Sequence, residues 1–147
     1  MTEFRKLSNS FYAAAQIEPS DVARAAEDGF AALISNRLDG EAPGQPSAAD
    51  MAQLAKGAGL AFHHIPIRPG AVTAEDLDRF EQAAASGQTL AFCASGARSA
   101  LLWALVQARA GAMEVDDILR ATAAAGFDFS AQRPTLAQLA KAAPGQR

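Results

Sequence analysis

Short apolar runs alternate with helix-like segments along the chain, and this alternation predicts an α/β fold. Four runs have the length and residue types of strands, at residues 11–17, 30–36, 60–67 and 89–93. Segments with helical spacing and helix start or stop signals follow them, at residues 18–29, 47–59, 73–87, 97–111, 115–126 and 134–143. Strands that alternate with helices form parallel sheets covered on both faces. We therefore expect three layers: a central, mostly parallel sheet of four or five strands, flanked by helices.

Composition and charge exclude several classes of function. The 147 residues fit one domain, 1–147, and the formal net charge of -3 argues against nucleic acid or anionic membrane as a partner. With one cysteine and two histidines, we expect no disulfide, no metal site and no cofactor. The first residues lack a signal-peptide pattern and no apolar run reaches membrane-spanning length, so we expect a cytoplasmic protein. The last residues, 144–147, are expected to fray, and the oligomeric state is left open.

The stretch LAFCASGARS, residues 90–99, carries the candidate chemistry. Cys93 ends the fourth apolar run, where a parallel sheet binds its ligands. We name residues 93–98 the Cys93 loop. Its N–H groups at a helix start would form an anion nest, with Gly96 permitting the turn and Arg98 gripping two oxygens. That positive field lowers a cysteine pKa and favours a thiolate nucleophile over the alternative, a small buried apolar residue.

These residues resemble a known family. The stretch FCASGARSALLWAL, preceded by NRLDGE, QPS and HHIPI, resembles the bacterial domains called beta-lactamase hydrolase-like protein, phosphatase-like domain (DUF442), some of which are labelled sulfurtransferases. The resemblance spans residue 4 to the helix with Trp103 and implies the fold of dual-specificity tyrosine phosphatases. It implies that Cys93 is the nucleophile, that Arg98 binds the oxyanion and that Ser99 assists departure of the thiolate. The amides implied to hold the anion are those of Ala94, Ser95, Gly96 and Ala97.

Two features leave the reaction open. Tyrosine phosphatases place five residues between the cysteine and the arginine, whereas this chain has four, which is nearer the loop of rhodanese sulfurtransferases. Tyrosine phosphatases also carry a histidine directly before the cysteine, and this chain has Phe92 at that position. Cleavage of a phosphate ester also needs a proton donor, yet the loop IPIRPGAVT contains no acid. The candidate acids nearby are Asp39, Glu41, Glu75, Asp76 and Asp78. The alternative for Glu75, Asp76 and Asp78 is that they stabilise the dipole of the predicted helix on which they lie. The alternative for Asp39 and Glu41 is that they are solvated residues of a surface loop. Arg37 in the same loop could add positive charge for binding an anion.

Three functions follow from these observations. The first is a cysteine-dependent phosphatase-like hydrolase acting on a phosphorylated substrate, favoured by the fold and the GxRS ending. The second is a rhodanese-like sulfurtransferase that forms a persulfide on Cys93 from a sulfane-sulfur donor, favoured by the loop length and the missing acid. The third is a non-catalytic module that binds a small oxyanion or a partner. His63 and His64 are adjacent on a strand and face opposite sides. We expect structural roles for them, with the alternative that one hydrogen-bonds a loop near Cys93. Trp103 is expected to lie in the core.

Overall fold

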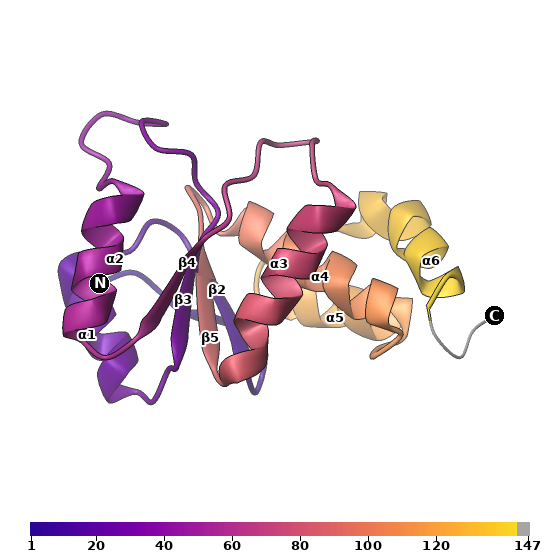
Figure 1. The fold of residues 1–147 in the computed structure, drawn as a ribbon. Coiled ribbons are helices and arrows are strands. Elements are labelled where there is room, and N and C mark those ends of the chain that lie inside the picture. The colour runs from indigo at the N-terminus through magenta and orange to yellow at the C-terminus, as the bar shows by residue number, and fades with distance from the viewer. Residues whose placement is uncertain (144–147) are drawn as a thin grey trace.

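A computed structural model describes residues 1–143 and has the predicted three-layer α/β architecture (Figure 1). Five strands form one sheet in the order β1-β2-β5-β3-β4. Their bounds are β1 Arg5–Ser8, β2 Phe11–Ala14, β3 Ala32–Ser35, β4 Ala61–His64 and β5 Thr89–Phe92. Strands β2, β5, β3 and β4 are mutually parallel, and β1 pairs antiparallel with β2. The expected fraying at 144–147 lies outside the described residues.

Helices cover both faces of the sheet (Figure 1). Their bounds are α1 Pro19–Glu27, α2 Ala48–Gly57, α3 Ala74–Ala83, α4 Ala97–Ala110, α5 Val115–Ala124 and α6 Arg133–Lys141, with short 3-10 turns at Ala84–Ser86 and Ser130–Gln132. Helices α1 and α2 pack on one face and build the smaller apolar core. Helices α3 to α6 lie on the other side, where α4 is central and carries Trp103 into the larger core. The placement of Trp103 in the core is therefore confirmed.

The central strands are apolar at successive positions because both of their faces are covered. Every residue of β3 and β5 is buried, as expected for parallel strands between two helical layers. The edge strand β1 reads Arg-Lys-Leu-Ser and buries only Leu7, so the apolar pattern does not single it out. The prediction of four or five strands rested on four apolar runs, and β1 is the fifth strand.

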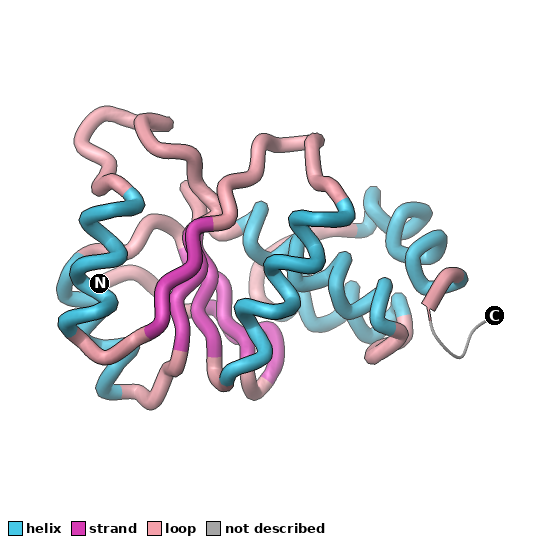
Figure 2. The backbone as a smooth tube through the Cα atoms, viewed as in Figure 1, coloured by secondary structure: helices cyan, strands magenta, loops and turns pink. Residues whose placement is uncertain are grey.

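The carboxyl ends of the four parallel strands lie side by side at one edge of the sheet. Phe92 at the end of β5 is paired with Ala14 of β2 and with Ser35 of β3, and Ser35 is paired with His64 of β4. The loops that leave these strands therefore meet above that edge, as Figure 2 shows at the top of the tube. One of them is the Cys93 loop between β5 and α4. Within residues 1–143, no helix combines the length and apolar character needed to cross a bilayer.

Candidate active site

The Cys93 loop folds its own amides around the sulfur. Cys93 follows β5 directly, and α4 begins four residues later at Ala97. Gly96, the N-cap of α4, has a left-handed φ of 95°, and its N–H donates to Cys93 Sγ at 3.1 Å. Only glycine adopts such a backbone without strain. The first turn of α4 and the loop before it therefore direct their donors at one buried sulfur atom.

Two opposing effects act on the Cys93 thiol. Burial of the side chain raises its pKa, because a thiolate is poorly solvated in the interior. Hydrogen bonds from backbone N–H groups lower it, and the donors belong to Ser99, Ser95, Arg98 and Gly96. The donors outweigh the burial, so the pKa of Cys93 is lowered. The thiolate population at neutral pH is raised accordingly, which is the condition for a nucleophilic cysteine.

The back of the Cys93 loop is closely packed. A Cβ atom at Gly96 would lie 3.1 Å from Phe127 Cζ and 3.3 Å from both the carbonyl carbon and oxygen of Ala14. The same Ala14 oxygen accepts the Cys93 N–H at 3.2 Å. Phe127 is itself held by Arg5, whose guanidinium lies 5.6 Å from the ring centroid and donates to Ala125 O at 2.9 Å. Arg5 of the edge strand β1 thus positions Phe127, in the segment after α5, and Phe127 in turn packs against the Cys93 loop at Gly96.

Arg98 is fixed by a bidentate ion pair with Glu41. Its Nη1 lies 2.7 Å from Glu41 Oε2 and its Nη2 lies 2.8 Å from Glu41 Oε1. Nη1 also donates to Ile67 O at 2.9 Å, which ties the guanidinium to the loop after β4. The hydrogen bonds with Glu41 raise the pKa of Arg98, and those from Arg98 are the main cause that lowers the pKa of Glu41 to about 2. Glu41 is therefore a carboxylate at neutral pH and has no proton to donate in this arrangement.

Arg37 also pairs with the carboxylate of Glu41. Its Nε donates to Glu41 Oε1 at 3.1 Å, and its Nη1 donates to Gln16 Oε1 at 2.9 Å. The Arg37 carbonyl oxygen lies 2.7 Å from His64 Nε2. Glu41 thus binds two arginines, Arg37 from the loop after β3 and Arg98 from the first turn of α4. It thereby fixes Arg98, the side chain that the sequence predicts to bind the oxyanion.

Asn36 connects three of the loops and was not singled out in the sequence. Its side-chain amide donates to Ile65 O at 2.9 Å, and its Oδ1 accepts from Ser99 Oγ at 2.8 Å. Its backbone N–H donates to Phe92 O at 2.9 Å. The side chain is fully buried, where an unpaired amide would be costly. The Ser99 hydroxyl therefore faces Asn36, and the backbone N–H of Ser99 is the group that acts on Cys93.

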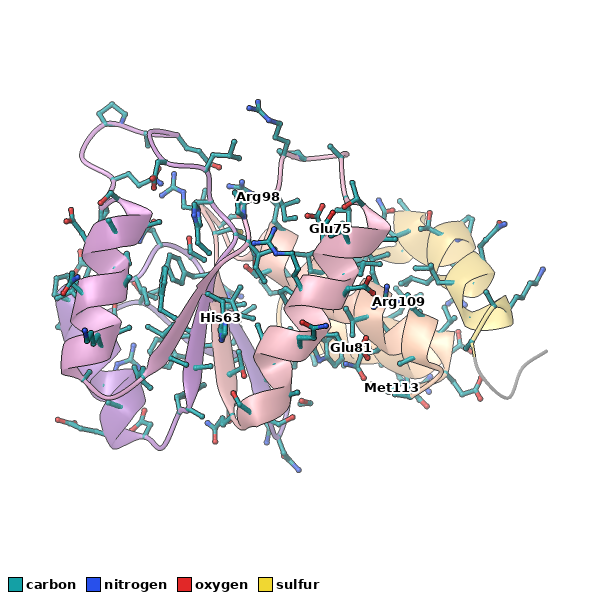
Figure 3. All side chains as sticks on the ribbon, in the orientation of Figure 1. His63, Glu75, Glu81, Arg98, Arg109 and Met113 are labelled. Atoms are coloured by element: carbon teal, nitrogen blue, oxygen red, sulfur yellow. The ribbon has the colours of Figure 1, made fainter. Side chains whose placement is uncertain are left out.

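Three of the other candidate acids have partners elsewhere. Asp39 Oδ1 accepts the Ala48 N–H at 2.8 Å, at the start of α2. Asp76 accepts the Thr73 N–H at 2.9 Å, which completes the capping box of α3. Asp78 pairs with Arg109 at 2.8 Å. Figure 3 places Glu75 at the N-terminal end of α3, at the same end of the molecule as Arg98. Glu75 is exposed there.

The comparisons with known proteins agree with this geometry. The sequence profile of the family described as beta-lactamase hydrolase-like protein, phosphatase-like domain matches residues 3–110. Curated relatives named beta-lactamase hydrolase-like protein are 35% identical over 106 residues in Xylella fastidiosa (71% of this chain, 25% of the relative) and 34% identical over 118 residues in Agrobacterium fabrum (79% and 27%). The chain thus spans about a quarter of the length of these relatives.

Solved structures give the same result. A candidate phosphatase of Neisseria meningitidis is 32% identical, with a TM-score of 0.81 over 92% of this chain and 97% of that chain. Kinase associated phosphatase shares the fold at 15% identity, with a TM-score of 0.69 over 94% of this chain and 92% of its own. The tyrosine phosphatase-like fold expected from the sequence is therefore confirmed. By sequence and by fold, the chain belongs to the phosphatase-like domain family of the beta-lactamase hydrolase-like proteins.

Proposed function

We propose that this phosphatase-like domain hydrolyses phosphate esters with Cys93 as its nucleophile. The observation that carries the proposal is that backbone N–H groups surround the buried Cys93 sulfur and lower its pKa. Arg98, at the end of the same loop, is held in place by Glu41. Cys93 Sγ bonds to phosphorus while the bond from phosphorus to the ester oxygen breaks, and that oxygen leaves with the electron pair. Water then attacks phosphorus, the sulfur–phosphorus bond breaks, and the proton of the water passes to the departing phosphate or to solvent.

The backbone donors and Arg98 supply the electrostatic part of this reaction. In this proposal the N–H groups that lower the pKa of Cys93 also donate to the oxygens of the transferring phosphoryl group. Donors already in place stabilise developing charge without reorganisation. Glu41 and Ile67 O orient the Arg98 guanidinium, and a planar guanidinium binds two oxygens of a phosphoryl group at once. In this proposal Glu41 is a positioning residue for Arg98.

A sulfurtransferase is the second candidate, and the four-residue spacing between Cys93 and Arg98 favours it. The absence of a carboxyl group from residues 65–73 points the same way. The Cys93 thiolate would attack the outer sulfur of thiosulfate, the sulfur–sulfur bond would break, and sulfite would leave with the electron pair. The persulfide on Cys93 would then pass its outer sulfur to cyanide or a thiol. This sequence needs no protonated leaving oxygen.

One pair of assays separates these functions. The purified protein is incubated with an aryl phosphate and, separately, with thiosulfate plus cyanide, next to Cys93→Ser. We expect phosphate release by the wild type, none by Cys93→Ser, and the same circular dichroism spectrum for both. Thiocyanate without phosphate would support the sulfurtransferase. Silence in both assays, with sulfate still raising the unfolding temperature, would support a binding module. Equal turnover by wild type and Cys93→Ser would overturn both enzyme proposals.

A further inference from the structure

The outer side of β4 is an open edge of the sheet. In the strand order β1-β2-β5-β3-β4, β4 pairs only with β3. It lies at the front of the molecule between α2 and α3, and no element of the described chain is drawn across it (Figure 1). None of its four residues is fully buried, whereas every residue of β3 and β5 is. Such an edge presents backbone N–H and C=O groups that can pair with another chain.

Phe62 and His64 carry the backbone groups that point outward from this edge. The N–H groups of Ala61 and Ile65 donate to carbonyl oxygens on the side of β3, at 3.0 and 2.9 Å. Alternate residues of a strand direct their backbone groups to opposite sides, so those of Phe62 and His64 point away from β3. The His64 carbonyl has this direction, because it accepts from Arg79 Nη2 on α3 at 3.0 Å. The N–H and C=O of Phe62 and the N–H of His64 are therefore available to a partner.

The opposite edge strand, β1, is protected against such pairing. It contains Lys6, and its register with β2 shifts between Lys6 and Ser8. A lysine and an irregular register are two of the means by which proteins block an edge. Strand β4 has neither: it reads Ala-Phe-His-His, and its residues pair with β3 in continuous register. The hydrogen bond from Arg79 covers a single carbonyl of β4. The sheet is thus blocked at one edge and open at the other.

A groove of about 390 Å³ runs between the edge of β4 and α3. His63, Arg79 and Gln82 line it, and Figure 3 shows His63 at this edge. The lining contains one arginine and two histidines but no carboxylate, although the chain has a net charge of -3. Within residues 1–143, the His63 ring and the Gln82 amide have no hydrogen-bond partner, and Arg79 has no ion pair. The groove is therefore complementary to negative charge.

The two faces of an added strand would meet different side chains. Successive side chains of β4 point to opposite faces of the sheet. Phe62 packs against the smaller core, on the side of α1 and α2, so His63 lies on the side of α3 and its groove. The side chains of a docked strand follow the same alternation. Acidic side chains at alternate positions would thus lie toward His63 and Arg79, and apolar ones toward Phe62.

Charge also distinguishes between candidate occupants. A second copy of this chain, paired through its own β4, would bring Arg79 of one copy toward Arg79 of the other, and like charges across a strand pair are destabilising. The net charge of -3 disfavours nucleic acid. Glu75 lies one turn before Arg79 on α3, so acidic residues fit beside β4 rather than beyond its carboxyl end. These charges favour a short acidic segment of another protein.

We propose that the outer edge of β4 and the facing side of α3 bind an extended acidic segment of a partner protein, which adds to the sheet as a further strand. The N–H and C=O of Phe62 and the N–H of His64 pair with the backbone of that segment. A backbone N–H of the segment replaces Arg79 at the His64 carbonyl, and the released guanidinium pairs with an acidic side chain. The segment is short, because Pro66 has no N–H and ends the edge.

The bound segment would lie next to the candidate active site. Strand β4 continues into residues 65–73, where the Ile67 carbonyl fixes Arg98 at 2.9 Å. A partner held at β4 therefore brings its neighbouring residues close to the Cys93 loop. This surface recruits a partner, and its binding does not depend on which reaction Cys93 performs.

The test uses a fluorescein-labelled peptide of alternating valine and glutamate residues, and the matched control peptide has lysine in place of glutamate. We expect fluorescence anisotropy to show binding of the glutamate peptide and none of the lysine peptide. In NMR spectra, hydrogen exchange of the Phe62 and His64 amides should slow on binding, whereas the amides of Ala61 and Ile65, already bonded on the side of β3, should change little. Cys93→Ser should bind the peptide like the wild type, which separates this inference from the proposed function.

Two variants of Arg79 test the charge contact. Loss of one exposed ion pair weakens binding about 1.4- to 5-fold, so Arg79→Gln should raise the Kd of the glutamate peptide by that factor. Arg79→Glu replaces attraction by repulsion and should raise the Kd about 2- to 25-fold. Arg120→Glu is the matched control, because it makes the same change of charge at an exposed position of α5, and it should bind like the wild type.

Several outcomes would overturn the proposal. The first is no binding of the glutamate peptide, or equal binding of the lysine peptide. The second is binding without slower exchange at Phe62 and His64, which would place the peptide elsewhere. Unchanged Kd in both Arg79 variants would remove the acidic preference. Protection of the same two amides by a single-stranded oligonucleotide, or by dimerisation of the protein without peptide, would assign the edge to nucleic acid or to a second copy instead.

Discussion

Gly96→Ala is a substitution whose cost follows directly from the geometry of the Cys93 loop. At a φ of 95°, a side chain brings a left-handed backbone strain of about 1–2 kcal/mol. The new Cβ would also crowd Phe127 Cζ at 3.1 Å and the backbone of Ala14 at 3.3 Å, and crowding in a packed region costs about 1–3 kcal/mol. The smaller entropy of the unfolded chain returns about 0.4–1 kcal/mol. The free energy of unfolding should fall by about 1 to 5 kcal/mol.

Gly59→Ala is the matched control for this experiment. Gly59 has a φ of 82°, and a Cβ atom there would meet nothing within 4 Å. The control therefore carries the same backbone strain and the same effect on the unfolded chain, but no crowding. The difference between the two variants isolates the crowding, about 1–3 kcal/mol. Urea unfolding followed by circular dichroism measures both, and equal m-values confirm that only stability has changed.

The same variant also reports on the sulfur. Gly96 donates its N–H to Cys93, so displacing the loop should raise the pKa of the thiol and slow its alkylation by iodoacetamide near neutral pH, whereas Gly59→Ala should react like the wild type. A Gly96→Ala protein that unfolds at the same urea concentration as Gly59→Ala would refute the reasoning about crowding. Unchanged alkylation in a destabilised Gly96→Ala protein would mean that Gly96 shapes the fold without stabilising the thiolate.

Two further predictions follow from titratable groups. Because the pKa of Cys93 is lowered, the rate of alkylation of the wild type should reach half of its maximum below the pH of about 8.5 at which a free cysteine does; a midpoint at or above that pH contradicts the lowered pKa. The pKa of Glu41 falls from 4.5 to about 2 on folding, so its stabilisation is fully present above pH 4.5 and is lost as the pH falls toward 2. The gap in unfolding free energy between wild type and Glu41→Gln should therefore narrow from pH 7 to pH 3, and a gap independent of pH would count against the ion pair with Arg98.

The sequence allowed the parts of the site that depend on neighbouring residues to be predicted. An apolar strand, a glycine and a helix start follow one another within residues 89–98, so the Cys93 loop and its donors are a local consequence of the chain. The parallel sheet was predictable for a similar reason, because each buried strand is a continuous apolar run. Strand β1 lacks such a run: its place depends on pairing with β2 and on the contact of Arg5 with Phe127.

The contacts made by polar side chains across the sheet edge were not predictable. Glu41 was considered as a proton donor because nothing near it in sequence reveals its partner, Arg98, which lies 57 positions away. The hydrogen bonds from Arg98 lower the pKa of Glu41 to about 2, so Glu41 is ionised at neutral pH and cannot act there as a proton donor. Asn36 has no local signal either, since its partners Ile65 and Ser99 lie 29 and 63 positions away. A single sequence lists such residues without the distances between them.

The hydrogen bonds of Asn36 have a consequence for how the domain acquires its function. Each joins distant parts of the chain, so a loop of 29 or 63 positions must close before the contact forms. Loop closure costs chain entropy before the contact returns any stability, which places such contacts late in the folding reaction. A nascent chain that ends at Cys93 contains the proposed nucleophile but lacks Ser99 and Arg98. Such a chain also lacks the donors of Ser95, Gly96, Arg98 and Ser99 that lower the pKa of the thiol, so its cysteine is an ordinary thiol until these residues are added and the Cys93 loop has formed.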